Sequence, residues 1–207
     1  MIRPPERLPE RDAAIEAMLP NVPFDGWTTR ALRAGLAAAG LPEDEATILF
    51  PGGAADMIAV FCDLADRRLT EAAAALTETK LTARVRAIIA LRLAMNRPHK
   101  EAIRRAVSVL ALPGHARAAA AITARTVDAI WHAAGDRSAD FSWYTKRAIL
   151  TAVYGATLLF WLRDTSDDDA DTRAFLDRRL RGVGRLTRAR ERASSLVGRL
   201  RPAWAIR

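Results

Sequence analysis

The chain has 207 residues, of which 50% are apolar and 6% aromatic, and it contains one cysteine. This length and apolar content suit one domain with a proper core, and the single cysteine excludes an internal disulfide and a cysteine-based zinc site. The formal net charge of +8 is unevenly spread, because residues 1–171 sum to −1 whereas residues 172–207, with 11 Arg and 2 acids, sum to +9. The basic character therefore belongs to the C-terminal segment and not to the body of the protein.

The first residues, MIRPPERLPERDAAIEAML, are charged and proline-rich and lack the apolar stretch of a secretory signal. The lone Cys62 fits a reducing compartment, and free cysteines are more often buried core residues than nucleophiles. We therefore expect the protein to stay inside the cell.

Proline and glycine divide the chain into helix-sized segments, and no β-branched run has the length of a strand. The expected helices, in chain order, are 11–19, 28–39, a short helix within 41–53, 54–76, 79–96, 98–112, 113–135, 142–163 and 171–188, with a last segment to Trp204. This pattern predicts an all-α protein with about nine or ten helices. We expect a degenerate helix-turn-helix-like head (1–70), a helical bundle (71–188) and a basic amphipathic tail (189–207).

Residues 148–162 form the most apolar stretch and contain no charge. A helix needs about 20 apolar residues to span a bilayer, so this shorter stretch predicts a buried helix or a helix with an exposed apolar face. Such a face would also suit a homodimer contact.

The helix-turn-helix-like head suggests DNA binding, but its charge has the wrong sign. No Lys or Arg occurs between Leu41 and Asp63, whereas five acids fall in that range. A duplex carries one negative charge per about 1.7 Å and would be repelled. DNA is therefore not an expected partner.

The sequence also lacks the motifs of the common catalytic sites. A di-iron site in a helical bundle needs Glu-x-x-His on two helices, but the residues three positions before His99, His115 and His132 are Asn, Leu and Ala. No nucleophile elbow, P-loop or dinucleotide fingerprint is present. We expect no catalytic residues, no metal and no cofactor.

The stretch AGDRSADFSWYTKRA, residues 134–148, joins two apolar helices. Its Ser and Asp residues are natural helix caps after Gly135. The caps leave Trp143 and Tyr144 unexplained, because neighbouring residues on a helix point about 100° apart and cannot both follow one buried stripe. At least one of these aromatic side chains is expected to face solvent or a partner.

The run GDRSADFSWYTKR, preceded by RTVDAIWHA and followed by LFWLRDTSDDDADTRAFLDRRL, resembles the coenzyme-Q-nine family of ubiquinone-biosynthesis accessory proteins. The similarity extends over most of the chain. The resemblance implies a fold similar to TetR regulators without DNA binding, and a bundle that encloses an apolar cavity for isoprenoid lipids. It also implies that the protein presents a polyprenyl quinone intermediate to the demethoxyubiquinone hydroxylase, a separate di-iron enzyme.

Carried over onto this sequence, the family's surface toward the hydroxylase falls on Asp140, Trp143 and Tyr144, all present here. Mitochondrial members have a longer amphipathic C-terminal helix that binds membrane, whereas this tail is shorter and more basic. The resemblance therefore supports the partner surface more directly than the membrane role.

The inward faces of the central helices are expected to line the lipid cavity. The candidate residues are Ile88, Leu91, Met95, Ile122, Ile130, Val153, Leu158 and Phe160. Ordinary core residues are the alternative, because a cavity and a packed core use the same residue types.

The tail has the pattern of an interfacial helix, with apolar residues surrounded by arginines. Its candidate membrane-binding residues are Leu196, Val197, Arg199, Leu200, Arg201 and Trp204. Each basic residue near anionic lipid contributes about 1 kcal/mol. The alternatives are a solvated tail and a nonspecific RNA-binding patch.

These observations predict a cytoplasmic, TetR-like lipid-binding protein that is peripheral on the inner face of the membrane and forms a homodimer. Its ligand is expected to be an isoprenoid quinone or a phospholipid. A ligand-responsive transcriptional regulator of the TetR type is the alternative.

Overall fold

The computed structural model describes residues 4–136 and 142–183, and all regular structure in these ranges is helical. The helices are α1 (Pro9–Met18), α2 (Val22–Asp25), α3 (Thr29–Ala38), α4 (Ala46–Leu49), α5 (Gly53–Ala72), α6 (Leu81–Met95), α7 (Lys100–Leu110), α8 (Ala116–Ala133) and α9 (Ser142–Trp161), and residues 170–183 are also helical. The all-α prediction is confirmed.

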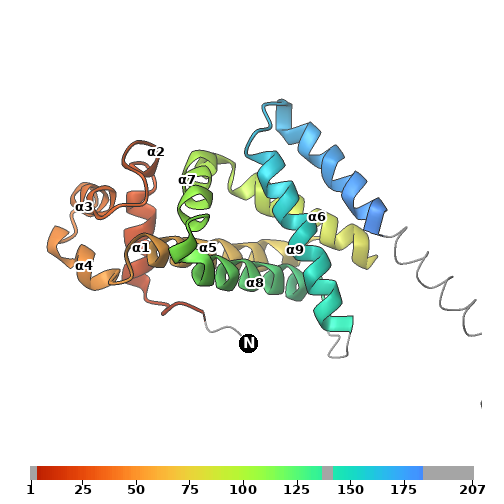
Figure 1. Cartoon of the computed structure of the whole chain (residues 1–207), viewed down its shortest axis with the longest axis horizontal. Helices are drawn as coiled ribbons and strands as arrows, with labels where there is room; N and C mark the ends of the chain where they lie inside the picture. The colour runs from red at the N-terminus through yellow and green to blue at the C-terminus, as the bar shows by residue number, and fades with distance from the viewer. Residues whose placement is uncertain (1–3, 137–141, 184–207) are drawn as a thin grey trace, which may run out of the picture.

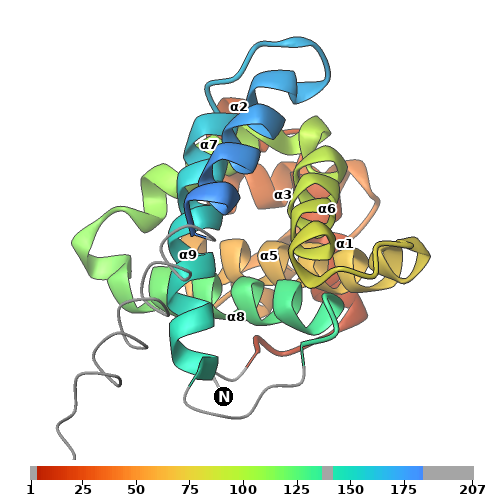
Figure 2. The same cartoon turned by 90° about the vertical axis from the view of Figure 1, so that its right-hand side faces the viewer.

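The helices form two groups joined by two long central helices. α1 to α4 lie together at one end of the molecule, and α6, α9 and residues 170–183 lie at the other end (Figure 1). α5 and α8 run alongside each other between these groups. The view along the long direction shows α9 beside residues 170–183 and in front of α8 (Figure 2).

The head formed by α1 to α4 depends on a close helix crossing. α3 begins at Thr28, whose Oγ1 accepts a hydrogen bond from the backbone N–H of Ala31 at 3.2 Å. α1 and α3 approach each other at Gly35, where an added Cβ would lie 2.6 Å from the backbone of Ala17 and from the Cα of Met18. Because backbone atoms cannot yield as a flexible side chain can, any larger residue at position 35 would push the two helices apart.

Trp27 connects the head to the bundle. Its buried indole Nε1 donates a hydrogen bond to the carbonyl oxygen of Ala102 in α7 at 2.9 Å. The Trp27 ring also packs on Phe61 of α5, with ring centroids 5.4 Å apart. Head and bundle therefore share a continuous set of contacts.

Two apolar cores lie along the molecule, and α5 contributes to both. Met57 and Ile58 pack with the head residues, whereas Leu69 packs with the bundle, and all three are almost fully buried. The second core contains Trp161 of α9 and Leu176 from residues 170–183. The 1–70 and 71–188 division remains a prediction.

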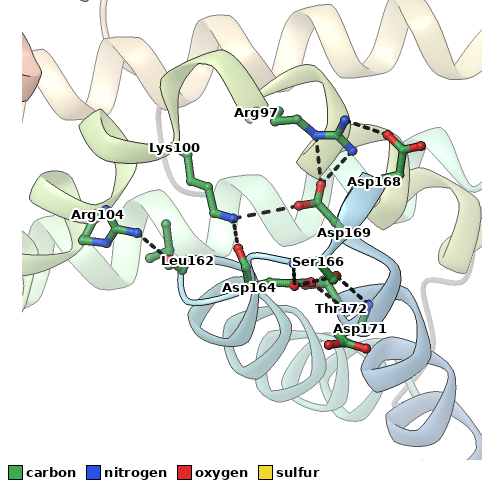
Figure 3. A network of polar contacts seen from close by, with 10 residues as sticks. All are labelled: Arg97, Lys100, Arg104, Leu162, Asp164, Ser166, Asp168, Asp169, Asp171 and Thr172. Carbon is green, nitrogen blue, oxygen red and sulfur yellow. Dashed lines mark hydrogen bonds and ion pairs between the residues drawn. The ribbon is translucent and has the colours of Figure 1, made fainter.

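A polar clasp holds the connection after α9 (Figure 3). The carboxylate of Asp164 accepts hydrogen bonds from the backbone N–H and hydroxyl of Ser166, at 2.8 and 2.6 Å, and from the same two groups of Thr172. Burial acts to raise the pKa of Asp164, but these four hydrogen bonds outweigh it and hold that pKa well below its ordinary value.

Basic side chains from the 3-10 turn before α7 and from α7 itself complete this clasp. Lys100 Nζ donates to the carbonyl oxygen of Asp164 at 2.6 Å, and Arg97 pairs with Asp168 and Asp169 at 3.0 and 2.9 Å (Figure 3). Arg104 donates to the carbonyl oxygen of Leu162. The segment after α9 is thereby fixed to α7 at several points.

The sequence-based helix boundaries agree with the structure within a few residues, with one omission. The short α2 was missed, because a four-residue helix with Pro23 near its start has no readable periodicity. The expected helix 171–188 is described as far as residue 183. The expected segment to Trp204 lies outside the described residues.

Candidate functional site

An apolar cavity of 330 Å³ lies inside the bundle. This volume falls at the lower end of the range for small-molecule sites. Helices α5 to α9 all contribute to its lining, for example through Ile58, Leu93, Ile103, Ile122 and Leu158.

The cavity exists because small residues occupy lining positions on three helices. These residues are Ala106 in α7, Ala119 in α8 and Gly155 in α9. A Cβ added at Gly155 would meet no heavy atom within 4 Å. Larger residues at these three positions would fill the cavity, whereas alanine and glycine leave it open.

The lining residues of the cavity differ in polarity and exposure. Leu159, which is 54% exposed, and the exposed Ala111 mark an apolar mouth between the end of α7 and α9. Arg92, Thr126 and Tyr154 also line the cavity, yet they are only 5%, 3% and 7% exposed. The polar wall is therefore a buried part of the lining.

The polar wall is a connected network of buried side chains. Arg92 Nε donates to the Tyr154 hydroxyl at 2.9 Å, and Arg92 Nη1 lies 2.5 Å from Asp66 Oδ1 in an ion pair that lacks hydrogen-bond geometry. The Thr126 hydroxyl donates to Asp66 Oδ2 at 3.0 Å. Burial raises the pKa of Tyr154, which keeps its phenol protonated at neutral pH, although Arg92 opposes the shift.

Burial also affects the other two titratable groups near this wall. It raises the pKa of Asp66, against the opposing effects of Arg92 and Thr126. It raises the pKa of the Cys62 thiol to about 12, so this cavity-lining residue is not a thiolate at neutral pH.

The structure distributes the eight expected lipid-binding residues over several environments. Ile122 and Leu158 line the cavity. Ile88, Ile130 and Val153 belong to the bundle core, at 0%, 0% and 5% exposure, and Val153 also lines a separate hollow. Leu91 and Met95 line two other hollows, and Phe160 stacks on Phe175. The predicted set therefore mixes cavity, core and surface positions.

The sequence interpretation missed Arg92 and Tyr154. A signal for Arg92 was available, because it follows Val85, Ile88 and Ile89 at helical spacing on the buried face of α6. An arginine on such a face needs a buried partner. The identity of that partner, Asp66 of α5, depends on helix packing.

The predicted partner surface lies at the start of α9. Tyr144 is 72% exposed. The backbone of Trp143 belongs to the first turn of α9, while its side chain and all of Asp140 lie outside the described part of the chain. The beginning of α9 is held by ion pairs from Lys146 to Asp136, just after α8, and from Arg147 to Asp128 within α8.

The predicted membrane-binding residues of the tail, Leu196, Val197, Arg199, Leu200, Arg201 and Trp204, also lie outside the described residues. Within 4–136 and 142–183, no single helix has both the length and the apolar character needed to cross a membrane. Two bent helix pairs, 43–49 with 53–75 and 97–110 with 113–133, meet the length and composition criteria together. No cluster of His, Cys, Asp and Glu suited to a metal ion occurs in the same described ranges.

The chain resembles known proteins in both sequence and structure. The family model COQ9 matches residues 116–187. The chain is 34% identical over 175 residues to the human "Ubiquinone biosynthesis protein COQ9, mitochondrial", an alignment that covers 80% of this chain and 55% of that protein. It is also 34% identical over 167 residues to the Schizosaccharomyces pombe protein of the same name, with 80% and 66% covered.

A solved structure shares the fold. The crystal structure of the TetR transcriptional regulator from Nitrosomonas europaea superposes with a TM-score of 0.66 and 23% sequence identity, covering 84% of this chain and 97% of the regulator. This confirms the TetR-like fold that was predicted from the sequence. The chain spans only a little over half of the human relative's length, yet the shared sequence runs through α8, α9 and residues 170–183. The protein belongs to the COQ9 family.

Proposed function

We propose that this protein acts in ubiquinone biosynthesis as a non-catalytic lipid carrier, which presents a polyprenyl quinone intermediate to the demethoxyubiquinone hydroxylase at a membrane surface. The observation that carries this proposal is the 330 Å³ cavity with its apolar lining and apolar mouth. Burial of a hydrocarbon chain there is favourable by about 25 cal/mol per Å² of apolar surface removed from water. The assignment to ubiquinone biosynthesis comes from the names of the relatives, which are called ubiquinone biosynthesis proteins.

The chemistry of the cavity suits binding better than catalysis. Its buried charges, Asp66 and Arg92, are committed to each other. The Cys62 thiol is protonated at neutral pH. We therefore assign the hydroxylation to the partner enzyme.

Lipid analysis of the purified native protein tests the carrier function. Mass spectrometry of an organic extract is expected to detect a co-purifying isoprenoid or phospholipid, and added decylubiquinone is expected to raise the melting temperature through preferential binding to the folded state. Failure of both results would contradict the carrier function.

A second prediction concerns the partner surface. We expect Tyr144→Lys to change the free energy of unfolding by no more than about 0.5 kcal/mol, because the side chain is largely exposed. Binding to the hydroxylase should weaken by about 30-fold or more, as expected for an aromatic hot spot. The measurement is a titration of the purified hydroxylase by surface plasmon resonance.

Ile48→Lys provides the control for this experiment, since Ile48 is 78% exposed but lies in the head. It should leave hydroxylase binding unchanged. Equal weakening by both substitutions would show that the start of α9 is not the binding surface.

The TetR-like fold keeps a ligand-responsive regulator as the alternative function. The region that follows α3 carries three exposed acids, Glu43, Asp44 and Glu45, which would repel a phosphate backbone. A gel-shift assay at low salt distinguishes the two functions, because a regulator would bind duplex DNA and the proposed carrier would not.

A further inference from the structure

The polar wall of the cavity contains a hydrogen-bond donor that lacks an acceptor. The Tyr154 oxygen accepts a hydrogen bond from Arg92 Nε, but within the described residues its own hydroxyl proton is donated to no group. Tyr154 is 7% exposed, so bulk water does not readily satisfy it. A buried hydroxyl that lacks an acceptor destabilises the folded protein, and a ligand oxygen at this position would satisfy it.

The charge balance of the wall restricts the kind of oxygen that fits. The positive charge of Arg92 is neutralised by Asp66 at 2.5 Å. An anionic head, such as a phosphate or carboxylate, would have to compete with Asp66 and would lie close to its negative charge. A neutral acceptor, such as a ring carbonyl, accepts from the Tyr154 hydroxyl without disturbing the ion pair.

The position of the wall sets the direction of the ligand. Tyr154 is 7% exposed, while Leu158 and the 54% exposed Leu159, about one turn further along α9, lie toward the mouth. A hydrocarbon chain that follows these leucines would keep apolar contact along its length.

We propose that the cavity binds its ligand head first, with a neutral carbonyl oxygen accepting a hydrogen bond from the buried Tyr154 and the hydrocarbon chain extending to the mouth at Leu159. This inference rests on the proposed carrier function and specifies the orientation of the lipid. Tyr154 is then the residue that distinguishes an oxygenated head from a plain hydrocarbon.

Two other buried donors of the lining lack a hydrogen-bond acceptor within the described residues. Arg92 Nη1 is already held in the ion pair with Asp66, so the indole of Trp161 is the donor that competes with Tyr154. Trp161 lines the same cavity, is 0% exposed, and its indole Nε1 has no hydrogen-bond partner within the described residues. Its ring is covered by Lys100 Nζ, 5.0 Å from the ring centroid, whereas Tyr154 belongs to the polar wall itself. The test therefore includes both residues.

The test compares decylubiquinone with decylbenzene, which has the same chain and no oxygen, by isothermal titration of the full chain. We expect the wild type to prefer decylubiquinone, and Tyr154→Phe to weaken its binding about tenfold while leaving decylbenzene binding unchanged. Tyr144→Phe is the matched control, since it makes the same change at the other, exposed tyrosine, and it should alter neither affinity.

The outcomes separate the inference from the function on which it rests. Binding of both probes without any effect of Tyr154→Phe would overturn the head-first orientation and leave the carrier function standing. Loss of the quinone preference in Trp161→Phe but not in Tyr154→Phe would also overturn it. If neither probe binds the wild type, the carrier function fails together with the inference.

A spectroscopic measurement on the wild type keeps the inference testable should Tyr154→Phe fold poorly. A hydrogen bond from the phenol lowers the infrared carbonyl stretch of ¹³C-labelled decylubiquinone. We expect one of the two carbonyl bands to shift on binding. Two unshifted bands in the bound quinone would contradict the proposed hydrogen bond.

Discussion

Gly155→Leu is expected to abolish lipid binding while the protein stays folded. The new side chain would project from α9 into the cavity. Because an added Cβ at this position meets no heavy atom within 4 Å, the leucine would fill the cavity without a steric clash at its Cβ atom. Leucine also favours a helix over glycine by about 0.5–1 kcal/mol. Overpacking of the occupied cavity costs about 1–3 kcal/mol, so we expect affinity for decylubiquinone to fall by more than tenfold.

The matched control for this variant is Gly182→Leu. Gly182 is exposed and helical, and a Cβ there also meets nothing within 4 Å, but it lies outside the cavity lining. Circular dichroism should show both variants folded, and only Gly155→Leu should lose bound lipid in the mass-spectrometric extract. Retention of lipid by Gly155→Leu would mean that the lipid binds elsewhere.

Arg92→Met is expected to lower the free energy of unfolding by about 3–5 kcal/mol, because it leaves Asp66 as an unpaired buried carboxylate. Both partners of this ion pair have under 10% of their side-chain surface exposed. The loss also removes the hydrogen bond that Tyr154 accepts. Urea denaturation of the two proteins measures the difference.

Two further variants show whether the buried ion pair is the cause. Arg86 lies on α6, as Arg92 does, and forms a more exposed ion pair with Asp177. Arg86→Met should therefore lower the free energy of unfolding by no more than about 1 kcal/mol. The double variant Asp66→Leu with Arg92→Met should recover much of the lost stability, since replacing a whole buried pair by apolar residues is often neutral. Equal losses in Arg86→Met and Arg92→Met would show that the buried pair is hydrated.

The longer helices were predicted well because each of them carries its own local signals. Thr28, for example, caps α3 as its residue type suggests, and Gly40, with φ of 67°, ends it. The family resemblance predicted the TetR-like architecture, which local signals alone do not specify. Helical geometry predicted that at least one of Trp143 and Tyr144 faces outward, and the structure places Tyr144 at 72% exposure.

The cavity was not predictable in the same way. It depends on how Ala106, Ala119 and Gly155 on three helices combine, and the distances between helices are a property of the whole fold. The spacing that identified Ile88 and Ile130 as inward-facing was correct about their burial, but inward-facing positions include both core and cavity. The Asp66 to Arg92 pair joins residues of different helices and has no sequence signature.

The hydrogen bond from Trp27 to Ala102 has a consequence for how the protein melts. It ties the head to α7, and α7 is also a wall of the cavity through Ile103 and Ala106. Head and bundle are therefore expected to unfold in one cooperative transition. Ligand binding to the folded state then stabilises both parts together, so a fluorophore attached to the distant head would report the ligand-induced rise in melting temperature.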